Sequence, residues 1–445
     1  MKGIDGHRVA ATNNPQQDPV DTHDRADLSR GPLALKLALS VVVLGVILGL
    51  ALNPTFYSET IVSAYSSLAM FGAVIVIAVT RRSWVDVLSI LGGTALLYLL
   101  DHRIMGFKPA FMSGFSFAGL AAFAVFGIRT VWARRDERKT FLYSLIPVTL
   151  FVMSEYLASS MLDLTEKLHP KTFDVFLYSF DSSLKVQFSF LAGQLFRKFQ
   201  PLRTLCLVFY IALPLPLALV YAEQLRKLGS KALFVMTAFL ITGPIGILGY
   251  NMMPACGPIH LFGRDFPFHP LSTAQAARMV LLTLPVQGAR NAIPSLHMTW
   301  VLLIWWNSRG LSRWVRAIAL SFVWATVLAT TGSGEHYVVD LVVAFPFSLM
   351  IQALSSYPVP LRTGPRRVAF LFGTFTTLAW LMLLSFGTRL FWISPILPWV
   401  LVVATVATSV VLWHRLLDVL FVPGQSTPCP EPADIAPPLA CAHRA

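Results

Sequence analysis

The chain is 445 residues long, with 55% apolar and 13% charged residues, and its mean hydropathy is +0.65. Ordinary soluble domains carry about 25% charged residues, so this composition excludes a disordered protein, a coiled coil and a soluble enzyme of ordinary surface. The net charge is +13, but the basic residues stand in short clusters between apolar runs. Such clusters orient a membrane protein and contact anionic lipid, so we expect a polytopic membrane protein that does not bind nucleic acid.

Apolar runs recur along the chain, and a helix that crosses a membrane needs about 20 mostly apolar residues. The sequence predicts an all-α, polytopic membrane helix bundle of about twelve spans. In chain order the predicted spans are 33–53, 60–79, 84–101, 110–128, 140–161, 204–222, 232–250, 294–308, 314–332, 336–355, 367–386 and 396–414. The eighth is the shortest.

The predicted spans divide the chain into five regions. These are a disordered polar tail (1–32), a four-span membrane region (33–139), a catalytic membrane core (140–360), two C-terminal spans (361–415) and a Pro-rich tail (416–445). A packing or assembly role is the expectation for the first four spans.

Clusters of Arg and Lys follow predicted spans two, four, six, eight and ten. Loops rich in basic residues stay in the cytoplasm, so twelve spans put all five clusters on the cytoplasmic side, together with both termini. The long segments 162–203 and 251–293 then lie on the outer face, which is periplasmic, extracellular or lumenal. In the first of them the stretch from Phe173 to Phe199 mixes aromatic and charged residues, which predicts an interfacial helix.

The segment from Arg290 to His297 reads Arg-Asn-Ala-Ile-Pro-Ser-Leu-His and leads into the eighth span. Pro294 suits the first turn of a helix, which places Ser295 and His297 at a helix N-terminus. The free N–H groups there form a site for an anion such as phosphate. The alternative is that His297 only caps a packed helix end.

A second candidate segment, from Gly332 to Asp340, leads into the tenth span. His336 and Asp340 are four residues apart and share a helix face. The carboxylate can hold one ring nitrogen and leave the other free to attack, and an ionisable group in an apolar run is usually functional. A structural His–Asp pair is the alternative. Because spans eight and ten begin on the same face, we expect His297, His336 and Asp340 to converge.

The stretch from Tyr250 to Pro258 follows the seventh span and leads into the outer loop. Candidate contacts to a lipid headgroup in this region are Tyr250, Arg264 and Arg278. Each of the two loop arginines could equally be a solvated loop residue.

Pro294–His297 followed by His336–Asp340 resembles the second and third signatures of the type 2 phosphatidic acid phosphatase superfamily. The pattern is most similar to the branch of inositol phosphorylceramide and sphingomyelin synthases, and the resemblance covers about 140–360. It implies a six-helix phosphatase-like core that transfers phosphate without metal or cofactor. His336 would attack phosphorus, Asp340 would orient its ring, and His297 would protonate the leaving oxygen.

The first signature of the phosphatases, with its Lys and Arg, is not found, and Thr330 and Ala329 replace the Arg and Ser that precede their third-signature His. Arg290 is the best substitute for the missing phosphate-binding cations, followed by Arg264 and Arg278. Asn291 and Ser295, beside it, complete the predicted phosphate site.

The resemblance implies an integral-membrane phosphotransferase of sphingolipid or other lipid metabolism. It would move an inositol-phosphate-like headgroup from a phospholipid donor to a lipid-hydroxyl acceptor through a phosphohistidine intermediate. A lipid phosphate phosphatase with water as acceptor is one alternative. A non-enzymatic lipid transporter or scramblase is another, and a metal enzyme that uses His297, His336 and Asp340 would need more ligands.

Overall fold

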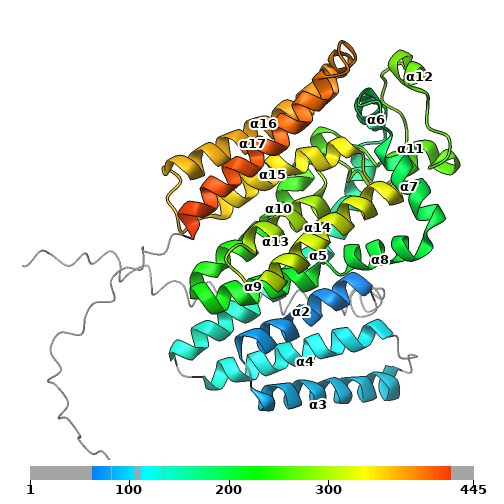
Figure 1. Ribbon diagram of the computed structural model, residues 1–445. Helices are drawn as coiled ribbons and strands as arrows, with labels where there is room; N and C mark the ends of the chain where they lie inside the picture. Colours follow the sequence, from blue (N-terminus) through cyan, green and yellow to red (C-terminus); the bar gives the residue numbers. More distant parts are fainter. Residues whose placement is uncertain (1–62, 82, 106–110, 134, 422–445) are drawn as a thin grey trace, which may run out of the picture. The chain divides into compact units, whose positions relative to one another are not determined.

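A computed structural model describes residues 63–421, apart from 82, 106–110 and 134. All regular secondary structure in this described part is helical (Figure 1), which confirms the predicted all-α class. The predicted first span and the polar N-terminal tail lie outside the described residues. The predicted C-terminal tail lies outside them from residue 422 onward, whereas 416–420 still belong to the last helix.

Helices follow one another along the described chain with short connections, except in the region between α10 and α13. Their bounds are α2 Ala64–Thr80, α3 Trp84–Leu100, η2 Asp101–Met105, α4 Phe111–Trp132, α5 Arg135–Leu168, α6 Asp174–Ser183, α7 Phe188–Lys198, α8 Gln200–Ile211, α9 Pro214–Leu228, η3 Gly229–Ala232, α10 Leu233–Met252, α11 Pro258–Phe262, η4 Gly263–Asp265, α12 Thr273–Arg278, α13 Leu296–Asn307, α14 Arg313–Ser333, α15 Val338–Ser355, α16 Gly364–Phe386, η5 Thr388–Trp392 and α17 Leu397–Leu420.

Seven helical stretches of the described chain are long and apolar enough to cross a membrane. They are Trp84–Arg103, Phe111–Trp132, Pro214–Met252, Arg313–Ser333, Val338–Ser355, Gly364–Phe386 and Leu397–Leu420. Each overlaps a predicted span, so the structure supports an integral membrane protein. The total of about twelve stays a prediction, since α2 has 17 residues and α13 only 12.

Two predicted elements differ from the structure. The predicted sixth span is interrupted, because α8 ends at Ile211 and α9 begins at Pro214, whose ring lacks the N–H group that continues a helix. The interfacial helix predicted within 173–199 is two helices, α6 and α7. Every residue of α6 but Phe176 is buried, against α11, α12, α15 and α16, so the interfacial prediction is wrong for that half.

The central helix of the bundle is α13, which packs against α10, α14 and α15. Four consecutive residues of α13, Val301 to Ile304, are completely buried. A helix that is apolar on every side is one surrounded by other helices. This surrounding packing accounts for the low charge of α13 and holds its first turn, which carries His297, inside the protein.

Small residues let α2 and α4 approach each other closely. A Cβ atom placed on Gly119 of α4 would lie 2.4 Å from the backbone of Met70 in α2. One turn earlier, Ser116 Oγ donates a hydrogen bond to Ser67 Oγ at 2.8 Å. Such contacts between small and hydroxyl residues hold membrane helices together where apolar burial gives no preference for protein over lipid.

Two alanine substitutions in α4 should therefore act in opposite directions. Gly119→Ala forces α2 and α4 apart and should destabilise the protein by about 1–3 kcal/mol, the usual cost of overpacking. Gly127→Ala adds a methyl group where no atom lies within 4 Å, so it should stabilise α4 by up to about 1 kcal/mol. Melting temperatures of the two variants in one detergent test this, and equal shifts would contradict the close approach.

Candidate active site

The start of α15 holds two of the predicted catalytic residues, His336 and Asp340. His336 lies just before the helix, Asp340 lies in its first turn, and both side chains are almost completely buried. The Nδ1 atom of His336 lies 3.4 Å from Oδ2 of Asp340. The four-residue spacing in the sequence does bring these two side chains together.

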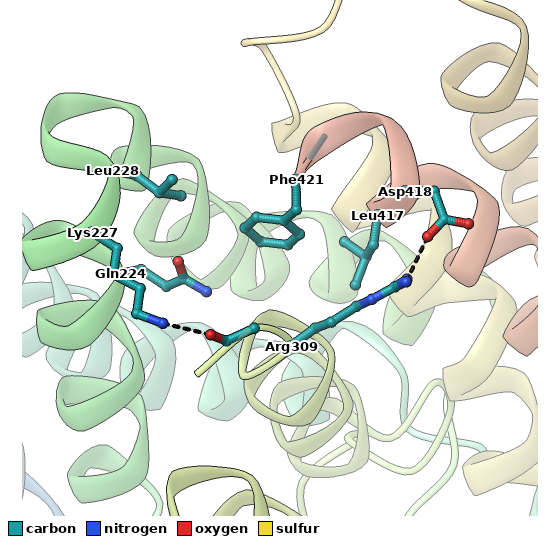
Figure 2. A pocket seen from close by; sticks show the side chains of 8 residues that line it. Gln224, Lys227, Leu228, Arg309, Leu417, Asp418 and Phe421 are labelled. Atoms are coloured by element: carbon teal, nitrogen blue, oxygen red, sulfur yellow. Dashed lines mark hydrogen bonds and ion pairs between the residues drawn. The ribbon is translucent and has the colours of Figure 1, made fainter. Parts of the chain in front are cut away.

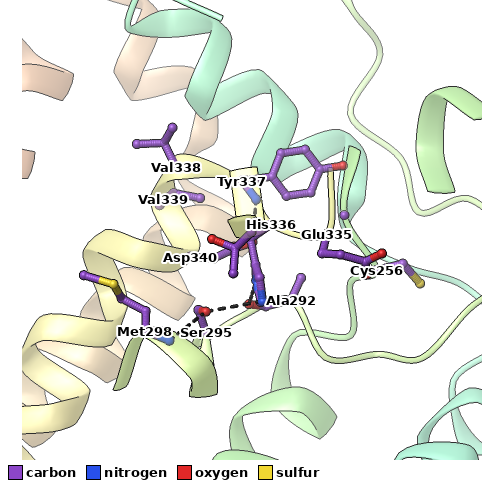
Figure 3. Close-up of polar contacts among 12 residues, drawn as sticks. Cys256, Ala292, Ser295, Met298, Glu335, His336, Tyr337, Val338, Val339 and Asp340 are labelled. Atoms are coloured by element: carbon purple, nitrogen blue, oxygen red, sulfur yellow. Dashed lines mark hydrogen bonds and ion pairs between the residues drawn. The ribbon is translucent and has the colours of Figure 1, made fainter. Parts of the chain in front are cut away.

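A backbone carbonyl determines which ring nitrogen of His336 carries the proton. Nδ1 lies 2.9 Å from the carbonyl oxygen of Ala292, and Nε2 lies 3.3 Å from Ser295 Oγ (Figure 3). A carbonyl oxygen only accepts hydrogen bonds, so Nδ1 is the donor and Nε2 keeps its lone pair. The unprotonated Nε2 therefore accepts the hydrogen bond from the hydroxyl of Ser295, the N-cap of α13.

Asp340 is fixed by the backbone around it. Its Oδ2 atom accepts a hydrogen bond from the N–H of Tyr337 at 2.7 Å, and its own carbonyl accepts one from the N–H of Ser295 at 3.3 Å. Its Oδ1 atom has no hydrogen-bond partner among the described residues. A buried carboxylate beside an imidazole stabilises the ring when it becomes positively charged.

His297 lies in the first turn of α13 and is held by aromatic neighbours. Its Nδ1 atom is 2.8 Å from the hydroxyl of Tyr210 in α8, and the two rings stack with centroids 3.9 Å apart. Trp300, one turn along α13, meets the same imidazole edge to face at 5.5 Å. The contact with Tyr210 thus engages Nδ1 of His297 and not Nε2.

Both histidines line one cavity of about 270 Å³. This volume is close to the lower limit of small-molecule sites, about 300 Å³. Most of the wall is aromatic or aliphatic, and the lining residues are Tyr65, Leu162, Tyr210, Ile211, Gly243, Ile247, Tyr250, Asn291, Leu296, His297, Trp300 and His336. These residues of the described chain include no Lys and no Arg.

Three further predicted site residues lie at this cavity. Asn291 and Tyr250 line it, and Ser295 contacts His336 at its edge. The loop residues Arg264 and Arg278 do not, since both are exposed and neither contributes to the wall.

Arg290 is not among the residues that line the cavity, so its predicted contact with phosphate has no support from the described cavity wall. Its side chain is buried and donates hydrogen bonds to the carbonyls of His169 and Gly288 and to the Sγ atom of Cys256. These contacts join the end of α5 to the loop before α13. Burial raises the pKa of the Cys256 thiol to about 12, so this group stays protonated.

The larger cavity, of about 600 Å³, lies at the other end of α13 (Figure 2). A 12-residue helix is roughly 18 Å long, so this cavity is remote from His297. Its two cations have partners already. Arg309 pairs with Asp418 at 2.5 Å, and Lys227 donates to the carbonyl of Gly310 at 2.5 Å. It contains none of the predicted site residues.

Asp181 in α6 has a structural role that the sequence analysis missed. Its two carboxylate oxygens accept hydrogen bonds from the N–H groups of Val338 and Val339, at 2.7 and 3.1 Å. These are the first two residues of α15, so Asp181 caps the helix whose start carries His336. The mixture of aromatic and charged residues in 173–199 predicts a helix at the membrane surface, whereas the structure uses Asp181 of this segment as a helix cap.

Asp174, two turns earlier in α6, joins two other segments, the turn after α10 and the start of α15. It accepts hydrogen bonds from the N–H groups of Cys256 and Gly257 and from the hydroxyl of Tyr337 at 3.0 Å. Gly257 has a φ of 119°, and a Cβ atom there would lie 2.4 Å from the carbonyl of Glu335. The turn after α10 is thereby packed directly against the residue before His336.

His260 in α11 contacts this same residue. His260 Nε2 lies 3.7 Å from a carboxylate oxygen of Glu335, and this contact raises the pKa of the His260 imidazole. No group of three or more His, Cys, Asp and Glu side chains in the described ranges is arranged to hold a metal ion.

Fold and site together define a helical membrane protein with a buried His–Asp pair and a second histidine in a mostly apolar cavity. Residues 175–354, from α6 to α15, match the family model of the PAP2 superfamily. This match supports the superfamily resemblance, and it suggests lipid phosphatase or phosphotransferase activity. It does not single out a branch. No curated protein and no solved structure matches the chain.

The cap at α15 leads to a prediction for Asp181. Asp181→Ala leaves two buried N–H groups unpaired and should destabilise the protein by about 1–3 kcal/mol, with a loss of turnover because His336 is no longer held. Asp181→Asn keeps one hydrogen-bond acceptor, so it should recover part of the stability and part of the turnover. Asp265→Ala, an exposed loop change, is the matched control, and melting temperature and turnover are measured together. Normal values for Asp181→Ala would contradict the role.

Arg290 should act on stability more than on chemistry. Arg290→Ala removes the donor for three acceptors and should lower stability by about 1–3 kcal/mol. Arg278→Ala, which changes an exposed side chain, should lower it by less than about 0.5 kcal/mol. If Arg290→Ala instead melts normally and loses turnover about a hundredfold, Arg290 contacts the phosphate after all.

Proposed function

We propose that this protein is an integral-membrane phosphotransferase that moves a phospho-headgroup between lipids through a phosphohistidine intermediate on His336. The observation that carries the proposal is the unprotonated Nε2 of His336, which lies at a mostly apolar cavity that His297 also lines. The match to the PAP2 superfamily supports the same class of chemistry.

In the first half-reaction the lone pair on Nε2 of His336 attacks phosphorus, and the bond from phosphorus to the lipid alcohol breaks. His297, in its imidazolium form beside the bound anionic phosphate, donates its proton to the leaving oxygen. This oxygen departs as the free alcohol, and His297 becomes neutral. Asp340 stabilises the positive charge that the ring of His336 acquires, through the Nδ1–H group that faces it.

In the second half-reaction His297, now neutral, accepts the proton of the incoming hydroxyl. The resulting oxygen attacks phosphorus, the P–N bond breaks, and His336 returns to its neutral form. The phosphate oxygens would be held by neutral donors, namely the amide of Asn291, the hydroxyl of Ser295 and the N–H groups at the start of α13.

The charge of the cavity favours a phosphodiester as the substrate. The described lining residues include no Lys or Arg, so the imidazolium of His297 is the positive charge that can offset a bound phosphate, and a second buried negative charge without a partner is costly. A diester carries one negative charge, whereas a monoester carries nearly two at neutral pH. A site with one imidazolium and otherwise neutral donors therefore fits transfer of a headgroup such as inositol phosphate better than hydrolysis of a lipid monoester.

The basic clusters support an active site on the outer face with both termini in the cytoplasm. On this proposal 140–360 is the catalytic membrane core, and a lipid hydroxyl such as that of ceramide is the acceptor. The acceptor is proposed from the resemblance of the motifs to the sphingolipid branch alone.

Trapping of labelled phosphate tests the proposal. Wild-type protein is incubated with phospholipids labelled at phosphorus, with and without ceramide or diacylglycerol, and is then quenched in alkali, since a phosphohistidine is labile to acid. His336→Ala should carry no label. His297→Ala should still be labelled by a nitrophenyl phosphodiester, whose leaving group needs no acid.

Asp340→Asn should be labelled far more slowly, because the amide no longer stabilises the charged ring. Label that survives in His336→Ala but disappears in His297→Ala would reverse the two roles. Full activity of all three variants would show that these residues are not the catalytic site and would contradict the proposed enzyme. If the product is the free phosphorylated headgroup whichever lipid acceptor is added, water is the acceptor and the protein is a phosphatase.

A further inference from the structure

The cavity that holds the two histidines extends along α10, away from them. Gly243, Ile247 and Tyr250 of α10 all line it, and their spacing of four and three residues puts them on one helix face. Tyr250 lies at the end of α10 near the reacting groups, and Gly243 lies about 10 Å further along the helix. Since α10 belongs to a stretch apolar enough to cross a membrane, this direction follows a helix that can lie in the hydrocarbon core of a bilayer.

Three glycines on α10 divide into two kinds. A Cβ atom on Gly246 would lie 2.4 Å from Leu296, and one on Gly249 would lie 2.7 Å from Pro294. These two glycines let the segment before α13 pack against α10. A Cβ atom on Gly243 meets no atom within 4 Å, so its missing side chain leaves open space in the cavity wall.

Part of the wall comes from helices outside the segment that matches the PAP2 superfamily. Tyr65 belongs to α2 and Leu162 to α5, whereas the match begins at residue 175. Both residues line the same cavity as His297 and His336. Leu162 lies within the predicted catalytic core, but Tyr65 belongs to the first four predicted spans, for which only a packing or assembly role is expected, so that region also contributes to the candidate site.

We infer that this arm of the cavity receives an apolar chain of the lipid substrate, that Gly243 keeps the space for it, and that α2 and α5 supply its outer wall. The inference rests on the proposed function for the identity of the substrate. Asn291 and the two histidines supply hydrogen-bonding groups to the part of the cavity where phosphate would bind. The aliphatic residues Ile247 and Leu162 offer no hydrogen-bonding group to a second polar ligand.

A larger residue at 243 is compatible with the helix although Pro244 follows it. The residue before a proline is restricted in a helix, but Ile146 in α5 and Phe345 in α15 occupy that position before Pro147 and Pro346. Gly243→Leu therefore tests the cavity rather than the backbone, and Gly243→Ala provides a milder variant.

The experiment compares two phosphodiesters. One is a long-chain phosphatidylinositol and the other is methyl nitrophenyl phosphate, which has no apolar chain. Gly243→Leu should lower kcat/KM for the lipid by about tenfold or more, the cost of excluding roughly two methylene groups, and change kcat/KM for the small diester by less than about twofold. Gly243→Ala should lie between wild type and Gly243→Leu.

Gly127→Leu is the matched control, since it also fills open space in a helix, but in α4 and away from the cavity. It should leave both substrates unaffected. Equal loss for the two substrates in Gly243→Leu, or no loss for either, overturns the inference. The melting temperature of each variant shows whether it has folded. If Gly243→Leu has not folded, the same comparison of the two substrates is made with Gly243→Ala.

A binding measurement separates this inference from the proposed function. Phosphatidylinositol with a diazirine in one acyl chain is photolysed on wild-type protein, and labelled peptides are mapped. Label on the α2 peptide with Tyr65 and on the α10 peptide with Gly243, reduced at least fivefold in Gly243→Leu, supports the chain site even if no turnover is found. Label that is absent from both peptides, or unchanged in Gly243→Leu, overturns it even if turnover is found.

Discussion

The candidate site depends on how the buried start of α15 is satisfied. The first N–H groups of a helix have no partner within it, and in an apolar bundle water does not replace one. Here Asp181 accepts from Val338 and Val339, and Asp340 accepts from Tyr337. Because His336 is the next residue back along the chain, these caps also set the position of its ring. The groups that complete the helix and the groups that orient the nucleophile are thus neighbours in one network.

Close packing of α10 brings the second half of the site to the first. Gly246 and Gly249 leave room for Leu296 and Pro294, so the segment before α13 lies beside the start of α15. Two atoms of that segment, the carbonyl oxygen of Ala292 and the hydroxyl of Ser295, then contact the two nitrogens of His336. A larger side chain at Gly246 or Gly249 would therefore displace the two groups that contact His336, in addition to weakening the packing of the bundle.

The arrangement also separates structural charges from the chemistry. Arg290 and Asp174 are buried, and both are saturated by contacts that join loops and helices. The cavity itself is left with neutral donors, two imidazoles and the carboxylate of Asp340 behind one of them. On the proposed mechanism, the positive charge that forms on His336 would have one nearby negative partner, in surroundings where such an interaction is strong.

Local patterns in the sequence determined the membrane class, the approximate bounds of the long helices and the pairing of His336 with Asp340. These depend on runs of about 20 residues or on spacings of four, which a helix converts directly into position. Only the tertiary structure showed which groups Arg290 contacts, that Asp181 caps α15, and that α2 contributes Tyr65 to the cavity wall. Asp181 and Val338 are 157 residues apart, and a contact over that separation depends on how whole helices pack. If α6 and α15 packed differently, the carboxylate of Asp181 could be solvated in a loop or at a membrane surface.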